Sequence, residues 1–307
     1  MQISTNYRYE RATGYVTKAQ DSLSTAQAQL ATGKRLLAPS DDPARAMRIE
    51  NIRGAAERQE SFRADLQLIQ YRYETEESAV RGVLESMTRF KELFLQATSD
   101  TAGTVDRQAI ATELRQVRAQ VVELMNAQDR DRQYIFSGTR VRAATYQEQS
   151  GAMVYAGDQT PVYVTTGDQR LQQFNRSGPD VFGRVVRSAG TEDQRAVGVF
   201  EVLDDAIAAI ESSDRDGLEQ GLDEIDQVYG RATLSLADIG GMQKNVEMQL
   251  DVVDETLLRL KTLQSEQEDL DYAVAVAELS KQSVALEAAM SSFAKIAALN
   301  LFDYLGR

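Results

Sequence analysis

The chain has 307 residues, of which 47 are acidic and 34 are basic, giving a formal net charge of −13. Because no basic stripe is available to neutralise phosphates, we expect no nucleic-acid partner. Cysteine and histidine are both absent, which excludes disulfides, the common zinc sites and the catalytic schemes that need either residue. The composition therefore predicts neither an enzyme nor a bound cofactor or metal.

A thin amphipathic helix is predicted over residues 5–32. Its apolar stripe includes Val16, Leu23 and Leu30, which fall on one helical face. These apolar side chains are few and small, so the helix has little stability of its own. We expect this N-terminal arm to depend on a surface that covers it.

A break is predicted between this arm and the next helix. Gly33 suits the end of the first helix and Pro39 prevents its continuation. Asp42 is expected to cap the next helix, with Pro43 in its first position, where the missing N–H costs nothing.

The next helix is predicted to run from 43 to about 99, with apolar residues repeating every seven positions. The repeat indicates packing against another long helix. One position holds Ile52, Leu66, Tyr73, Val80, Met87 and Phe94, and its companion holds Ala55, Phe62, Ile69, Val83, Phe90 and Ala97. Gln59 and Glu76 are the exceptions. A third helix is expected over 105–132.

The composition changes in the segment 138–190, which contains seven of the 19 glycines. Short alternating runs at 153–155 and 162–164 predict strands. We interpret this segment as a small β module, after which helical periodicity returns from Val199 and again from Leu218.

No glycine or proline occurs in 242–305, so an uninterrupted helix of roughly 95 Å is predicted there. Its final part, 283–302, carries only Glu287 and Lys295 as charges. The candidate interface residues of this C-terminal arm are Val284, Leu286, Met290, Phe293, Ile296, Leu299, Leu301 and Phe302. A helix apolar on nearly every side must be enclosed.

Two kinds of enclosure are open to this helix. A membrane span is disfavoured, because charges at mid-bilayer cost about 3 kcal/mol each. Enclosure by the N-terminal arm and by other molecules is the better interpretation. The predicted fold is mainly α, an antiparallel long-helix bundle or coiled coil built from both chain ends, with a small inserted β module.

The expected domains follow from this order of elements. Residues 1–40 and 271–307 form the terminal arms, which make up an assembly domain. A helical bundle domain comprises 41–137 and 191–270, and 138–190 form the β insert.

Three other sequence patterns are explained more simply by structural roles than by metal binding or catalysis. Asp214 to Gly217 matches part of a calcium loop but lacks the final glutamate, so we expect Asp216 to cap a helix instead. The pairs Asp41–Asp42 and Asp204–Asp205 are more typical of helix starts and solvated faces than of acid–base catalysis. Gly240–Gly241 indicates a close helix crossing or a bend.

Several stretches closely resemble bacterial flagellins and their relatives. They are QLATGKRLLAPSDDP at 29–43, ADIGGMQKN at 237–245, and LDYA at 270–273 followed by ELSK at 278–281. The opening ISTN at 3–6 with Tyr9, and YIFSGT at 134–139, resemble the family members that lie at the junction of hook and filament.

This resemblance implies an extracellular structural subunit of the flagellum, exported unfolded and without a cleaved signal peptide. The implied partners are the preceding junction protein, flagellin, further copies in a ring and an export chaperone, and the terminal arms are implied to form an inner helical tube. An ordinary flagellin filament subunit and a cytoplasmic coiled-coil adaptor remain as alternatives.

Overall fold

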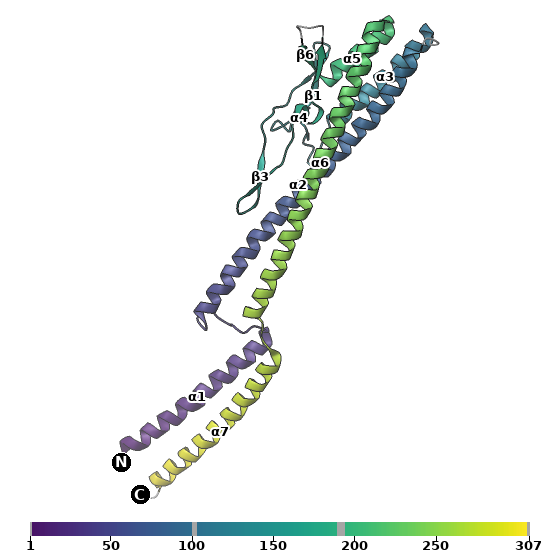
Figure 1. The fold of residues 1–307 in the computed structure, drawn as a ribbon. Helices are drawn as coiled ribbons and strands as arrows, with labels where there is room; N and C mark the ends of the chain where they lie inside the picture. Colours follow the sequence, from purple (N-terminus) through teal and green to yellow (C-terminus); the bar gives the residue numbers. More distant parts are fainter. Residues whose placement is uncertain (1, 100–102, 189–193, 306–307) are drawn as a thin grey trace. The chain divides into compact units, whose positions relative to one another are not determined.

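The computed structural model describes residues 2–99, 103–188 and 194–305. Within these ranges the fold is mainly α with a small β module, which confirms the predicted class (Figure 1). The helices are α1 (Gln2–Thr32), α2 (Pro43–Thr98), α3 (Thr104–Met125), α4 (Gly178–Phe182), α5 (Val199–Ser212), α6 (Arg215–Glu268) and α7 (Tyr272–Leu305). The strands are β1 (Tyr146–Gln149), β2 (Ala152–Tyr155), β3 (Tyr163–Gly167), β4 (Arg170–Gln173), β5 (Val185–Ser188) and β6 (Gln194–Val197).

The chain divides into two compact units. The arm unit comprises 1–58 and 255–307, and the core unit comprises 59–254. Within the arm unit, α1 and α7 lie side by side and antiparallel, so that the start of α1 and the end of α7 lie at the same end of the pair (Figure 1).

In the core unit, α2 and α6 pack antiparallel. Gln243 Nε2 donates to Glu77 Oε2 at 2.8 Å, Arg63 pairs with Asp254 at 3.6 Å, and Lys91 pairs with Asp226. Residue numbers rise along one helix as they fall along the other. The seven-residue repeat of α2 faces inward, since Leu66, Tyr73, Val80, Met87 and Phe94 are all fully buried.

α3 and α5 extend this helical packing in the core unit. Arg118 of α3 pairs with Asp204 of α5, and Arg107 donates to Ser213 Oγ at 2.8 Å. The predicted extent of α3 was too long, because the helix ends at Met125. The next residue, Asn126, uses its side-chain amide to bind both N–H and C=O of Tyr146, which turns the chain toward the β module.

In the described part of the β module, the strands form three antiparallel pairs, β1–β2, β3–β4 and β5–β6. The alternating runs at 153–155 and 162–164 correspond to β2 and the start of β3, as predicted. The last strand pair extends past the expected end of the module at 190, because β6 pairs Val197 with Val185 of β5. The module contacts the long helices through Tyr73, whose hydroxyl donates to the carbonyl of Gln173.

Three further helical predictions need correction. The expected continuous helix over 242–305 is wrong, since α6 ends at Glu268 and α7 begins at Tyr272. Gly240 and Gly241 lie inside α6, and a Cβ on either would meet no atom within 4 Å, so no other described element crosses closely at these glycines, and the alternative of a bend stays a prediction. Asp216 lies in the first turn of α6, which begins at Arg215, rather than before the helix.

Candidate assembly surface of the terminal helices

The seam between α1 and α7 takes the small apolar residues that the sequence places on one face of each helix. On α1, Ala12 and Ala26 are buried, and Val16, Leu23 and Leu30 are half-buried. These five positions step by three or four residues or by their sum, which places them on a single helical face. The stripe on α1 therefore faces α7.

On α7 the corresponding seam residues are Ala275, which is buried, and Leu286, Phe293 and Ile296, which are half-buried. The rings of Tyr9 and Phe293 lie 5.3 Å apart between centroids, a distance typical of a favourable aromatic pair. Because most seam side chains are alanine or only half-buried, this pairing buries little apolar area compared with the core of α2.

The part of α7 that α1 leaves exposed, which we call the outward face, has no partner among the described residues. Val284 is 65% exposed and Met290 is 53% exposed. Ten residues between 283 and 297 are exposed, and only Glu287 and Lys295 among them are charged. Contiguous apolar surface of this kind marks interaction sites on soluble proteins.

The predicted interface residues thus fall into three groups. Those of α1, together with three of α7, line the seam within the chain, whereas Val284 and Met290 lie on the outward face. The side chains of Leu299, Leu301 and Phe302 lie outside those that the structure describes.

The predicted break lies where both arms meet the long helices. Gly33 ends α1 with φ of +67°, a conformation that favours glycine, and Pro39 is exposed in the following turn. The side chain of Asp42 accepts a hydrogen bond from the N–H of Arg45 at 3.0 Å, and Pro43 is the first residue of α2.

A second break, at 269–271, lies directly against the first. The N–H of Leu270 donates to the carbonyl of Gly33 at 3.0 Å, and the N–H of Arg35 donates to that of Glu268 at 2.9 Å. Lys34 Nζ lies 2.6 Å from Glu268 Oε1. We call this backbone pairing of 33–35 with 268–270 the clasp.

In the sequence, the second break is marked by one residue only, Asp271. Asp271 accepts hydrogen bonds from the N–H groups of Ala273 and Val274, at 3.0 and 3.2 Å, and so caps α7. The helix breaks at 269–271 although 242–305 contains no glycine or proline, so the absence of these residues did not guarantee a continuous helix.

Charge is distributed unequally between the two units. The arm unit contains 14 basic and 14 acidic residues, whereas the core unit contains 20 basic and 33 acidic residues. The whole net charge of −13 is therefore carried by the core unit. Helices without net charge can approach copies of themselves without long-range repulsion.

The other acidic candidates serve structural roles. Asp41 accepts from the N–H of Ala38 at 2.8 Å, Asp204 pairs with Arg118, and Asp205 pairs with Arg187 at 2.7 Å. Among the described residues, no group of three or more acidic side chains is placed to hold a metal ion.

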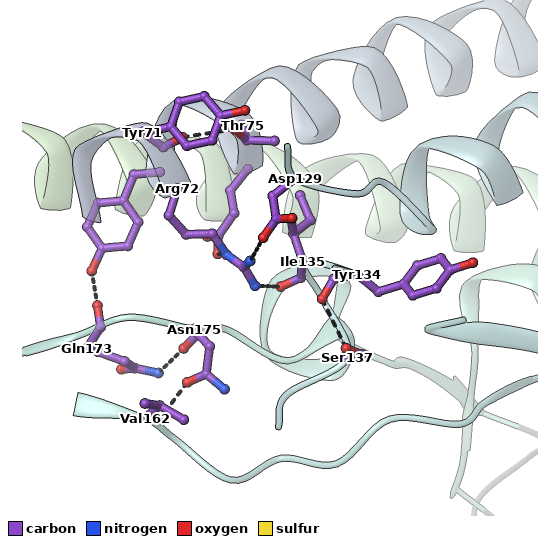
Figure 2. A network of polar contacts seen from close by, with 12 residues as sticks. Tyr71, Arg72, Thr75, Asp129, Tyr134, Ile135, Ser137, Val162, Gln173 and Asn175 are labelled. Atoms are coloured by element: carbon purple, nitrogen blue, oxygen red, sulfur yellow. Dashed lines mark hydrogen bonds and ion pairs between the residues drawn. The ribbon is translucent and has the colours of Figure 1, made fainter. Parts of the chain in front are cut away.

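A buried polar network lies in the core unit where α2 meets the β module (Figure 2). The guanidinium of Arg72 donates to the carbonyl of Ile135 at 2.6 Å and lies 3.3 Å from Asp129 and 3.5 Å from Glu76. Glu76 is fully buried, although the heptad pattern of the sequence marked it only as an exception.

Burial raises the pKa of Glu76 to about 7, and the nearby guanidinium groups of Arg72 and Arg176 offset only part of this shift. Burial also lowers the pKa of Arg72, against the opposing influence of Glu76 and Asp129. Both shifts show that desolvation outweighs charge pairing here.

In the ranges that the structure describes, no helix combines the length and apolar character needed to cross a bilayer.

Comparisons with known proteins identify relatives for both ends of the chain. Residues 3–141 match the bacterial flagellin N-terminal helical region. The chain is 25% identical to flagellar hook-associated protein 3 of Salmonella typhimurium, over 99% of each chain. It is 22% identical to a flagellin of Listeria monocytogenes, over 95% of this chain and 94% of that protein.

A solved structure shares the fold. The putative flagellar hook-associated protein from Vibrio parahaemolyticus superposes with a TM-score of 0.66 at 21% identity, covering 75% of this chain and 100% of that one. The mainly helical architecture with a small β module is thus shared with a protein of known structure.

Proposed function

We propose that this chain is a member of the bacterial flagellin family and a structural subunit of the flagellum that joins hook-associated proteins to the filament. The relatives that it matches over nearly its whole length include a flagellar hook-associated protein. A structural role also suits a chain without cysteine or histidine. The proposed site of action is outside the cell, on the flagellum.

The observation that carries this proposal is the outward face of α7. In the arm unit α1 covers only one side of α7, and Val284 and Met290 remain more than half exposed on the other. Burying one large apolar side chain contributes roughly 1.5–3 kcal/mol. Contacts with copies of this chain and with neighbouring axial proteins would supply that burial and order the arms at the same time.

The proposed partners follow from this role. They are the preceding junction protein, the first flagellin subunits and further copies of this chain in a ring. An export chaperone that covers the arms before assembly completes the set. The net charge on the core unit and the neutral arms suit contacts made through the arms.

The experiment is to replace the outward face and follow incorporation into flagella. The double variant Val284→Gln, Met290→Gln should fold with unchanged helicity, because both side chains are exposed, yet fail to enter the flagellum. Leu234→Gln is the matched control, since Leu234 is 72% exposed on α6 of the core unit. Normal incorporation of the double variant would contradict the proposal.

Two alternatives have their own tests. A filament subunit of the same family would be present in many copies along the filament, whereas a junction subunit would be present in few. A cytoplasmic adaptor would be missing from sheared flagella altogether.

A further inference from the structure

A pocket of about 260 Å³ lies within the core unit, where the strands β1 and β2, the end of α4 and the start of α5 come together (Figure 1). Its walls include the aromatic rings of Tyr146, Tyr155 and Phe200 and the flexible side chain of Met153. The ring of Tyr146 stands edge-to-face with the other two, at 5.6 Å from Tyr155 and 5.2 Å from Phe200 between centroids. Pockets that bind ligands usually enclose about 300–1,000 Å³, so this pocket suits a small ligand with a flat apolar body.

The hydroxyl of Tyr146 is a donor without an acceptor in this pocket. The Tyr155 hydroxyl donates to the carbonyl of Asp158 at 2.6 Å, whereas no described residue forms a hydrogen bond with the hydroxyl of Tyr146. Burial raises the pKa of Tyr146, with a further contribution from Tyr155 and an opposing one from Arg184, so the proton stays on the oxygen. A largely enclosed hydroxyl without a partner carries a free-energy cost that a bound acceptor would remove.

Two further features of the pocket favour a negatively charged ligand. Arg184 lines the pocket, and no carboxylate among the described residues lies within ion-pair distance of it. α5 begins directly after Gly198, which supplies no side-chain cap, so the first N–H groups of this helix lack an acceptor from the described residues. The acidic residue at the rim, Glu201, is already paired with Arg195. The pocket therefore offers a guanidinium, a phenolic O–H and helix N–H groups to an acceptor that carries negative charge.

We propose that this pocket binds a small aromatic carboxylate, with its ring against Tyr146 and Phe200 and its carboxylate facing Arg184, the Tyr146 hydroxyl and the start of α5. An inorganic anion would gain the charged contacts but leave the aromatic walls uncovered, and a neutral arene would leave the donors unpaired. All residues that line the pocket belong to the core unit, so this inference is independent of the proposed assembly through the arms.

The probe for this proposal is benzoate, titrated into the full-length protein while the backbone amide signals of Phe200 and Glu201 are followed by NMR. We expect saturable shifts of both signals with a dissociation constant of about 1 mM, the weak range that suits a ligand of this size. Benzamide has the same shape but no charge, and it should bind about tenfold more weakly because hydrogen bonds to charged groups are stronger. Absence of shifts with benzoate, or equal affinity for benzamide, would overturn the proposal.

Two substitutions test the polar contacts separately. Arg184→Gln should weaken benzoate binding about tenfold, whereas Arg170→Gln, the same change of charge on the exposed start of β4, should leave it unchanged. Tyr146→Phe should weaken binding severalfold without lowering the stability of the core unit, because the hydroxyl bonds to no described residue. If Tyr146→Phe lowers stability and leaves benzoate binding unchanged, the hydroxyl has a structural role and its contact with the ligand is refuted.

A third substitution, Gly198→Leu, blocks the pocket while its charged groups stay in place. The backbone of Gly198 has φ of −81° and ψ of 162°, a conformation open to any residue, and an added Cβ would meet no described atom within 4 Å. The leucine side chain should fill the pocket and abolish the benzoate shifts, while circular dichroism shows unchanged helicity. Unchanged benzoate affinity in this variant would place the ligand elsewhere and overturn the proposal.

Discussion

The carboxylate of Glu76 lies 3.5 Å from the guanidinium of Arg72, and both side chains are buried where α2 meets the β module. Neither Oε atom of Glu76 accepts a hydrogen bond from a described residue. The pair is therefore held by charge and packing rather than by a complete set of hydrogen bonds, and its cost depends on whether Glu76 is ionised.

We predict that the core unit loses stability as the pH rises from about 4.5 to about 7. The folded pKa of Glu76 is raised to about 7 from an ordinary value of 4.5. Over that window the unfolded chain releases a proton that the folded chain retains, so the free energy of unfolding falls, by about 3 kcal/mol from this group. Urea unfolding followed by circular dichroism at several pH values measures the change.

Glu76→Gln should flatten this dependence, since the amide has similar size and carries no charge at any pH. Glu77→Gln is the matched control on the same helix, because hydrogen bonds from Gln243 and Arg81 lower the pKa of Glu77 and give it the opposite pH trend. A Glu76→Gln variant with the same pH profile as the parent protein would show that Glu76 stays ionised throughout.

We predict that Gly33→Ala weakens the clasp. Alanine at a positive φ costs about 1–2 kcal/mol, and its Cβ would lie 2.8 Å from the hydroxyl oxygen of Tyr272. Amide exchange at Leu270 and Arg35 should accelerate, because both donate across the clasp. Tyr272→Phe in the same chain should recover only the steric part of the loss.

Gly14→Ala provides the contrasting control for this prediction. Gly14 lies within α1, and an added Cβ would meet nothing within 4 Å. That substitution should stabilise the helix by about 1 kcal/mol. Equal destabilisation by both changes would show that the conformation of Gly33 is not what matters.

Amide exchange on the isolated full-length protein should differ sharply between the two units. Residues 1–35 and 275–307 should exchange quickly, since the seam of the arms buries chiefly alanines such as Ala12 and Ala275. Slow exchange is expected in α2 around Leu66, Tyr73 and Phe94, which are fully buried. Uniform protection from end to end would mean that the arms are stable without partners.

Salt should strengthen self-association of the full chain. The core unit carries the net charge of −13, so copies repel one another at low ionic strength. The Debye length is about 10 Å at 0.1 M salt and shortens further above it, whereas apolar contacts between arms are not weakened. Sedimentation velocity at two salt concentrations measures the effect, and weaker association at high salt would indicate contacts dominated by ion pairs.

The periodic parts of the fold could be read from the sequence. The seven-residue repeat of α2 predicted its buried face from Leu66 to Phe94, and every one of those heptad residues is buried. The stripe of Val16, Leu23 and Leu30 likewise predicted which side of α1 is covered. Periodicity sets which face is apolar, and tertiary packing then uses that face.

The missed features depend on single side chains that meet distant backbone. α3 stops where the amide of Asn126 binds Tyr146, and α7 starts where Asp271 provides a cap. Glu76 occupies a heptad position, so the pattern gave its location but not the buried arginines that surround it. Which side chains of α7 stay exposed beside α1 depends on how the two helices are rotated about their axes, and residue spacing alone does not fix that rotation.

The clasp also constrains the order in which the molecule can be completed. Lys34 and Glu268 are 234 positions apart along the chain, so this contact closes a long loop, and we expect it to form late in folding because the entropy cost of loop closure grows with loop length. A chain that contains only one of the two clasp segments, 33–35 or 268–270, has no neighbouring segment that could replace the other. The beginning of the chain must therefore wait for its end before this junction can form, and a truncated product cannot mimic the finished subunit there.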